Sequence, residues 1–138
     1  MGNNHSVQKI NFEYMQEEIN DNRSYIISTL PIDKQECLIL GTLTPDREVE
    51  ILNANLKSNT SIKLIVYAMN ACDESLAIKC HQLLKLGFSN LYVYAGGLFE
   101  WLLLQDIYGE ELFPTTMICS DHLKFKGNKS NRLLLVNK

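Results

Sequence analysis

The sequence predicts an α/β domain in which a mainly parallel sheet is covered by helices on both faces. Short apolar runs alternate with amphipathic segments along the chain, and the connections between them are short. Such alternation is typical of right-handed crossovers between parallel strands. Residues 62–67 are also apolar almost throughout, as expected of a central strand that is buried on both faces.

The first part of the chain predicts one helix and two strands. Asn11 is a suitable cap for a helix over residues 12–20, where apolar side chains recur at helical spacing. Residues 25–30 are rich in β-forming side chains, and Pro31 ends this predicted strand. Residues 37–40 form a second short apolar run, which we interpret as a strand.

The middle of the chain predicts two amphipathic helices on either side of the central strand. Thr44 and Pro45 combine a capping hydroxyl with a proline in the first turn, a pattern that begins helices. The apolar face of the first helix is expected to contain Val49, Leu52 and Leu56. The apolar face of the second is expected to contain Leu76, Ala77, Cys80, Leu83 and Leu84.

The last predicted elements are a strand and a strongly apolar helix. Gly87 ends the preceding helix, and residues 91–94 have the composition of a strand. Gly96 and Gly97 then turn the chain into a helix over residues 98–108. No phosphate-binding glycine pattern accompanies this turn, so we interpret it as structural.

Length, charge and cysteine content exclude several classes of protein. A chain of 138 residues has room for one compact domain, and a net charge of −3 provides no basic field for nucleic acid. No apolar stretch approaches the roughly twenty residues of a membrane-spanning helix. The four cysteines lack metal-ligating spacing, so we expect reduced thiols, no metal and no cofactor. They are Cys37, Cys72, Cys80 and Cys119.

The chain is expected to divide into three parts. Residues 1–10 are predicted to be a flexible N-terminus, residues 11–113 the domain, and residues 114–138 a basic C-terminal tail or arm. The sequence leaves open whether the residues after Phe113 add a strand or pack as an arm, because Pro114 disfavours a helix there.

Several motifs between residues 62 and 101 resemble those of a rhodanese-like domain. They are Ile65-Val66-Tyr67, Gly87-Phe88, Leu91-Tyr92-Val93-Tyr94, Gly96-Gly97 and Glu100-Trp101. The resemblance implies a three-layer α/β fold with a five-stranded parallel sheet and helices on both faces. In active members it implies sulfur transfer through a cysteine persulfide, or a cysteinyl phosphate in the related phosphatases. The nucleophilic cysteine of both stands first in the loop after the strand, where this chain has Ala68.

The loop that corresponds to the active site is unsuited to this chemistry. Cys72 is the nearest cysteine, but it does not take the nucleophile's place, and the carboxylates of Asp73 and Glu74 disfavour a thiolate and repel anions. We further expect Asp73 to cap the next helix and so to occupy backbone N–H groups that an anion would use. The active-site-like loop comprises Ala68, Met69, Asn70, Ala71, Cys72, Asp73, Glu74 and Ser75.

These observations favour a non-catalytic interaction or scaffold module that binds another protein. The alternative is a small sulfurtransferase that uses Cys72 as its sulfur carrier, acting on thiosulfate or a persulfide. A third alternative is a structural component of a larger assembly. The sequence identifies no specific partner, and nucleic acid is not expected to be one.

The two ends of the chain suggest a membrane tether. Gly2 and Ser6 match the N-myristoylation pattern, which would make the protein a lipoprotein. One acyl chain gives only marginal binding, and the basic residues from Lys124 to Lys138 offer a second signal. The alternative is an unmodified terminus and a solvated tail whose leucines pack on the domain or on a partner. The first ten residues lack the apolar core of a secretory signal. We therefore expect a cytoplasmic protein, at the cytoplasmic face of a membrane or in a cytoskeletal assembly.

Overall fold

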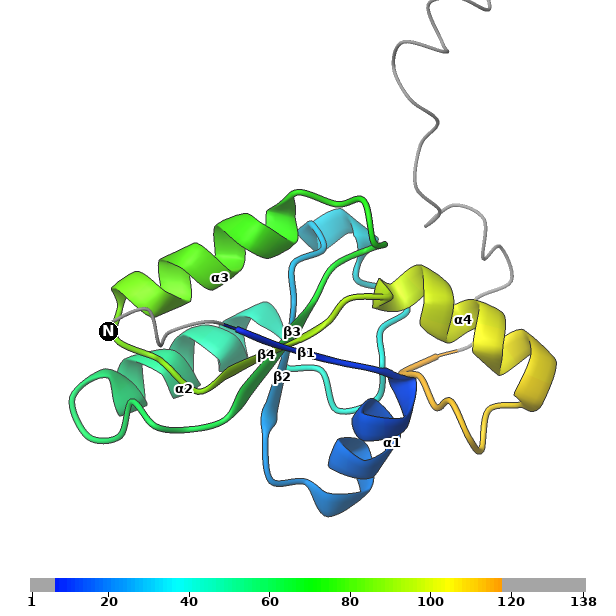
Figure 1. Cartoon of the computed structure of the whole chain (residues 1–138), viewed down its shortest axis with the longest axis horizontal. Helices are drawn as coiled ribbons and strands as arrows, with labels where there is room; N and C mark the ends of the chain where they lie inside the picture. Colours follow the sequence, from blue (N-terminus) through cyan, green and yellow to red (C-terminus); the bar gives the residue numbers. More distant parts are fainter. Residues whose placement is uncertain (1–6, 118–138) are drawn as a thin grey trace, which may run out of the picture.

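A computed structural model describes residues 7–117, which form nine helices and strands (Figure 1). Strands alternate with helices along most of this length, as the sequence predicts. In chain order the elements are β1 (Gln8–Ile10), α1 (Phe12–Asp21), β2 (Tyr25–Ser28), the short 3-10 helix η2 (Ile32–Lys34), α2 (Pro45–Leu56), β3 (Leu64–Tyr67), α3 (Ser75–Lys85), β4 (Leu91–Tyr94) and α4 (Gly97–Tyr108).

The four strands form one parallel sheet in the order β1-β4-β3-β2. All four residues of β3 are buried, which explains the continuous apolar run in the sequence. Tyr67 pairs with Ser28 on one side and with Tyr94 on the other, so three strands end at one edge of the sheet. The predicted α/β class is therefore confirmed, and the loop after β3 leaves from this carboxyl edge.

A fifth strand is not formed within residues 7–117. The apolar run at residues 37–40, which we interpreted as a strand, contributes only an isolated antiparallel bridge between Ile39 and Thr115. A single parallel bridge joins Thr42 to Ile26 of β2, where the N–H of Leu43 also donates to the Ile26 carbonyl at 2.9 Å. The chain thus lies beside the sheet for one residue pair, because Gly41 turns it with a φ of +94°.

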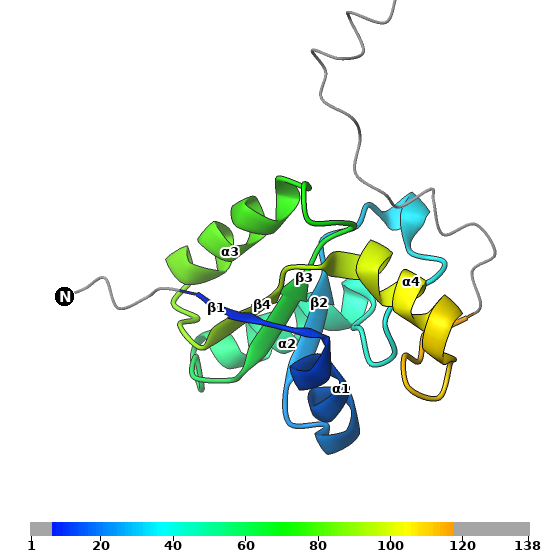
Figure 2. The same ribbon diagram turned by 45° about the vertical axis from the view of Figure 1, so that its right-hand side comes forward.

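The domain begins earlier than the sequence predicts. Residues 8–10, assigned to a flexible N-terminus, form β1, and Lys9 is paired with Val93 of β4 (Figure 2). A strand of three residues is too short to show the alternation that identifies strands in a sequence. Its position at the sheet edge is determined by pairing with β4, which sequence periodicity does not report. Residues 1–6 lie outside the described part of the chain.

The predicted side-chain caps of α1 and α2 are confirmed. Asn11 accepts the N–H of Tyr14 at 3.0 Å, and Thr44 accepts that of Arg47 at 3.3 Å. One predicted core position of α2 is wrong, because Val49 is 59% exposed and Ile51 is buried instead. Leu52 is buried and Leu56 packs against the same core cluster, so these two predicted positions of α2 do face the sheet.

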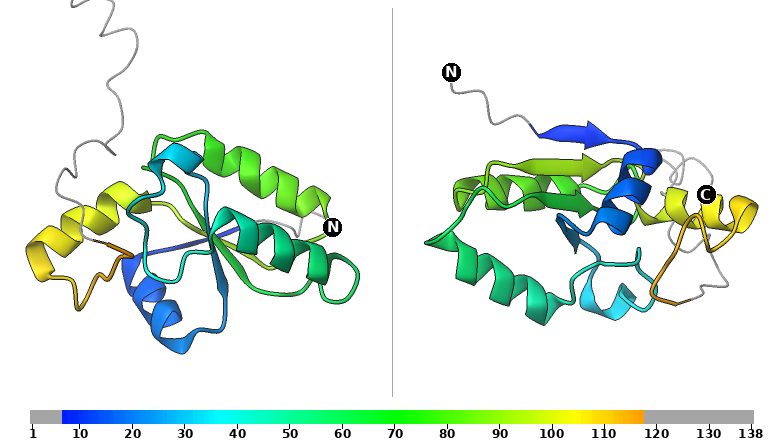
Figure 3. Two further views of the ribbon diagram at one scale, coloured as in Figure 1. Left: turned by 180° about the vertical axis from the view of Figure 1, so that it is seen from behind. Right: turned by 90° about the horizontal axis from the view of Figure 1, so that it is seen from below.

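The helices cover both faces of the sheet, in agreement with the expected layers (Figure 3). On one face, Leu52 of α2 and Leu83 of α3 pack against Val66 of β3. On the other face, Met15 of α1 and Trp101 of α4 pack in a second core cluster. Trp101 is completely buried, and so are Tyr67 and Tyr94, the last residues of β3 and β4.

Residues 109–117, which follow α4, pack as an arm, and their bridge between Thr115 and Ile39 is isolated. Phe113 is 2% exposed, and its carbonyl accepts the Gln105 side-chain amide at 2.8 Å. The indole N–H of Trp101 donates to the Pro114 carbonyl at 3.0 Å, and Thr116 donates its N–H to Leu38 at 2.8 Å. The remainder of the predicted basic tail lies outside the described residues.

The Tyr67 hydroxyl attaches the segment of the missing fifth strand to the sheet. It accepts the N–H of Ile39 at 3.1 Å and bonds the Thr42 hydroxyl at 2.7 Å inside the core. We predict that Tyr67→Phe lowers the free energy of unfolding by about 1–3 kcal/mol, because it leaves buried polar groups without this partner. Urea denaturation measures the change, and Tyr108→Phe on the exposed side of α4 is the matched control. Equal stability of both variants would contradict the assignment.

Candidate functional site

The active-site-like loop, residues 68–75, connects β3 to α3 at the carboxyl edge of the sheet. Ligands of parallel α/β proteins bind beyond this edge, so the loop lies where the sequence predicts a site. Ala68, at the nucleophile's expected position, is completely buried. Its methyl group provides neither a nucleophile nor a polar contact.

The loop is pressed against the first turn of α4. Gly97 has a φ of +74°, and a Cβ atom there would lie 2.8 Å from the carbonyl oxygen of Ala68. The same carbonyl accepts the N–H of Leu98 at 3.0 Å, and the carbonyl of Met69 accepts that of Phe99 at 2.9 Å. Glycine is therefore required at position 97, and these two N–H groups of the α4 N-terminus are already bonded.

Asp73 bonds backbone N–H groups at both ends of the loop. Its Oδ1 accepts the N–H of Ser75, the first residue of α3, at 3.0 Å, so Asp73 bonds the start of the helix as predicted although Glu74 is the residue in the cap position. Its Oδ2 accepts the N–H of Met69 at 3.4 Å. Asn70 accepts the N–H of Cys72 at 2.9 Å through its side-chain oxygen. Three backbone donors of the loop therefore bond to side chains of the loop itself.

Cys72 is exposed, in contrast to the buried Cys37 and Cys80. It stands at the solvent side of the loop, next to the carboxylate of Asp73 and close in sequence to the exposed Glu74. Residues 69–75 contain no lysine, arginine or histidine that would stabilise a thiolate. The thiol is accessible, and the two residues that follow it in the sequence, Asp73 and Glu74, carry carboxylates.

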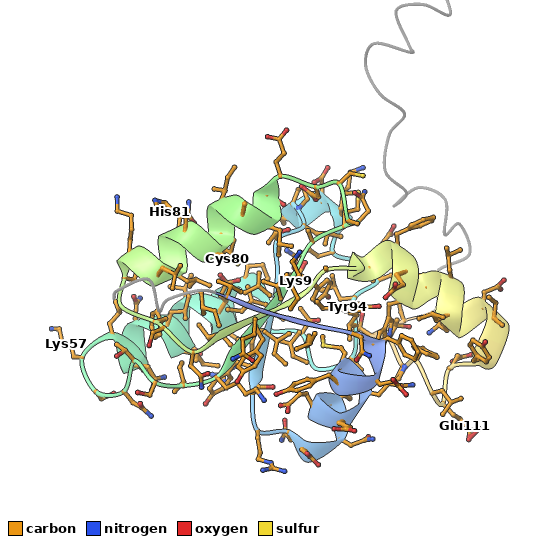
Figure 4. All side chains as sticks on the ribbon, viewed as in Figure 1. Lys9, Lys57, Cys80, His81, Tyr94 and Glu111 are labelled. Atoms are coloured by element: carbon orange, nitrogen blue, oxygen red, sulfur yellow. The ribbon has the colours of Figure 1, made fainter. Side chains whose placement is uncertain are left out.

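The glycine turn before α4 holds a carboxylate of the protein. The hydroxyl of Tyr94 donates to the carboxylate of Glu100, which folds back over Gly96 (Figure 4 labels Tyr94). Burial and the charge of Glu100 raise the pKa of Tyr94 above its ordinary value, so the hydroxyl remains a donor. The prediction that this turn is no phosphate site is consistent with the negative charge there. Neither a motif nor the spacing of residues indicates the contact between Tyr94 and Glu100.

A cleft of about 360 Å³ lies beside the carboxyl end of β2, between α2 and α3. The hydroxyls of Thr29 and Ser75 are 2.7 Å apart in its wall. Lys79 is the basic side chain among the described residues that line the cleft, and its ammonium pairs with Glu48. The pair is separated by 31 positions, so sequence spacing could not identify it. The cleft consequently offers no unpaired cation to an anionic substrate.

Neither a cluster of metal-ligating side chains nor a membrane-spanning helix is found among the described residues. Within residues 7–117, no group of three histidine, cysteine, aspartate or glutamate side chains could hold a metal ion. Over the same residues, no helix has both the length and the apolar character needed to cross a bilayer. Gly2 and the basic residues after Lys124 lie outside this range.

Comparisons with known proteins support the fold alone. No protein-family model matches the chain, and no curated protein matches it. Among solved structures, the Alr3790 protein from Anabaena sp. is 20% identical with a TM-score of 0.58, over 79% of this chain and 80% of that one. The BH2092 protein from Bacillus halodurans is 13% identical with a TM-score of 0.58, over 75% and 74%.

Two further structures extend the same similarity. A full-length protein from Lactobacillus plantarum is 16% identical with a TM-score of 0.58, over 80% of this chain and 88% of that one. Wild-type EanB is 12% identical with a TM-score of 0.51, and the match covers 65% of this chain but 24% of EanB. The α/β architecture is thus shared with proteins of very different sequence, as expected of a widespread fold.

Proposed function

We propose that the protein is a non-catalytic, rhodanese-like interaction module. The rhodanese-like assignment is supported by the places that its motif residues occupy. Phe88 and Trp101 are completely buried, and Gly87 and Gly97 both have positive φ angles at element boundaries. The four parallel strands and the single bridge at Thr42 approximate the five-stranded sheet that the family resemblance implies.

The occupied loop is the observation on which the non-catalytic proposal rests. A persulfide or a phosphoryl group needs converging backbone N–H groups, because these stabilise negative charge without a change in structure. Here Asp73 and Asn70 accept three N–H groups of the loop. An anionic substrate would have to displace a carboxylate of the protein from its own bonds.

A sulfurtransferase that uses Cys72 is the competing function, and one observation favours it. The thiol is exposed and therefore accessible to thiosulfate. In such a reaction the Cys72 thiolate would attack the outer sulfur of thiosulfate, form an S–S bond and release sulfite. Cyanide would then take the sulfur as thiocyanate and regenerate the thiolate. Repulsion between the carboxylates of the loop and the thiosulfate dianion opposes the first step.

We predict no thiocyanate formation above the uncatalysed rate when the full chain is incubated with thiosulfate and cyanide. Cys72→Ser should give the same background, and intact-mass measurement should find no additional sulfur on the protein. Turnover by the parent that Cys72→Ser abolishes would contradict the non-catalytic proposal and support the alternative.

The outward side of α4 is the surface best suited to protein docking. Most residues of this helix are apolar, the exceptions being Glu100, Gln105 and Asp106. Leu103 is nevertheless 38% exposed and Ile107 is 68% exposed, one helical turn apart. Exposed Tyr108 and Leu112 extend the same end of the helix. A protein partner that covers this face would bury an apolar surface otherwise left in contact with water.

We predict that Leu103→Glu with Ile107→Glu abolishes partner capture. The double variant places two charges where the apolar partner surface would lie, so proteins retained by the full chain from its native source should be lost. Quantitative mass spectrometry measures the loss. Val49→Glu with Ile78→Glu is the matched control, since both side chains are exposed but lie on α2 and α3. Equal capture by both double variants would exclude α4 as the docking face.

A membrane tether through Gly2 is the second part of the proposal. After removal of Met1, the Gly2 amine would attack the thioester of a myristoyl-coenzyme A, form an amide bond and release the coenzyme A thiol. A single myristoyl chain binds membranes with an association constant of only about 10⁴ M⁻¹. Lysine and arginine side chains after Lys124 would add attraction to an anionic cytoplasmic leaflet.

A further inference from the structure

An apolar groove lies between β1 and α3, away from the active-site-like loop. Its volume is about 410 Å³, within the range of about 300–1,000 Å³ that is common for small-ligand sites. No carboxylate is present among the described residues that line it. The apolar lining consists of Val7, Leu76, Ala77, Cys80, Leu84 and Val93.

The groove exists because β1 extends the sheet beyond the cover of α3. Cys80 and Leu83 of α3 pack against the inner strands, and Val93 of β4 is buried beneath them. Val7 and Leu84 belong to the same cluster but are only half-buried. In Figure 4, Cys80 lies on the side of α3 that faces β1, with Lys9 close by on the strand. An apolar surface is thus left partly uncovered at the sheet edge.

The charges around the groove favour a neutral, apolar ligand. Burial raises the pKa of the Cys80 thiol above its ordinary value, so the floor of the groove is uncharged at neutral pH. The polar lining residues are Lys9 and His81, and both are exposed at the rim. A hydrocarbon chain fits such a lining, because its burial removes apolar surface of both the ligand and the groove from water. It also breaks no ion pair, since no carboxylate is among the described lining residues.

An acyl chain on Gly2, as proposed above, would be tethered close in sequence to a residue of this groove. Val7, the first described residue, forms part of the wall, so the N-terminal segment starts there. Gly2 precedes Val7 by five residues, a length that spans at most about 18 Å when extended. We propose that the β1–α3 groove holds the myristoyl chain carried by Gly2. This inference rests on the acylation proposed above.

A groove that holds the acyl chain acts as an alternative to the membrane. The chain can be buried either between β1 and α3 or in a bilayer, but not in both at once. When the groove is occupied, the acyl chain is not available to the membrane. The apparent membrane affinity therefore equals the affinity of the free form multiplied by the fraction of molecules whose acyl chain is free. If about one molecule in ten has a free acyl chain, membrane binding is about tenfold weaker than for the same protein with a blocked groove.

The first test measures the accessibility of Cys80. The full chain is produced together with an N-myristoyltransferase, and Gly2→Ala provides the unacylated control. Alkylation by iodoacetamide, followed by peptide mass spectrometry, should proceed several-fold more slowly at Cys80 in the acylated chain. Exposed Cys72 is the internal control and should react at the same rate in both proteins.

The second test blocks the groove without changing the acyl chain. Ala77→Phe places a ring in the groove from an exposed position of α3, and Gln82→Phe places the same ring on the other side of that helix, in the wall of the cleft next to β2. Binding to phosphatidylcholine vesicles that contain phosphatidylserine is measured by sedimentation. Acylated Ala77→Phe should bind about tenfold more tightly than the acylated parent, whereas Gln82→Phe should bind like the parent.

The outcomes separate the groove from the tether. An acylated chain with unchanged Cys80 reactivity and with no gain in vesicle binding by Ala77→Phe overturns the groove proposal and leaves the tether intact. A chain that the transferase fails to acylate overturns both.

Discussion

The carboxylate of Asp73, bonded to N–H groups at both ends of one loop, is the constraint on which the site depends. It joins Met69, just after β3, to Ser75, at the start of α3. Loops at this edge of a parallel sheet bind anions when their N–H groups point at a ligand. A fixed negative charge in that position opposes the binding of an anion to the loop. The exposed thiol of Cys72 lies in the same loop, two residues from the Asn70 side chain that accepts its N–H.

The rest of the molecule reinforces this arrangement. Carbonyls of the loop accept the N–H groups of Leu98 and Phe99, and Gly97 permits the close approach of the two segments. These contacts place the loop and α4 in one packed unit, with Trp101 in the core beneath. What remains for interaction is peripheral: the exposed apolar side of α4, and the groove between β1 and α3. The interaction role proposed above depends on these two surfaces, since the fold itself specifies no chemistry.

The sequence predicts the parts of this structure that have local causes. Caps at Asn11 and Thr44, the buried central strand, and the capping role of Asp73 all follow from side chains within a few residues of their targets. Features that depend on distant segments could not be predicted. Strand β1 forms through its pairing with β4. Residues 37–40 do not form a strand of the sheet, because the N–H of Leu40 and the carbonyl of Leu38 bond to Pro114 and Thr116 of the arm. To predict the groove, one would have to know where α3 lies relative to the edge of the sheet. The periodicity of the sequence does not contain this information.

The most direct test of the occupied loop is a titration of the ¹⁵N-labelled full chain with thiosulfate, followed by NMR of the backbone amides. If Asp73 and Asn70 hold the loop donors, the amide signals of Met69, Cys72 and Ser75 should show no saturable shift up to millimolar anion. Asp73→Asn, which removes the charge and keeps an oxygen acceptor, is the informative comparison. Saturable shifts at these three amides in the unmodified chain would show that the loop binds anions after all.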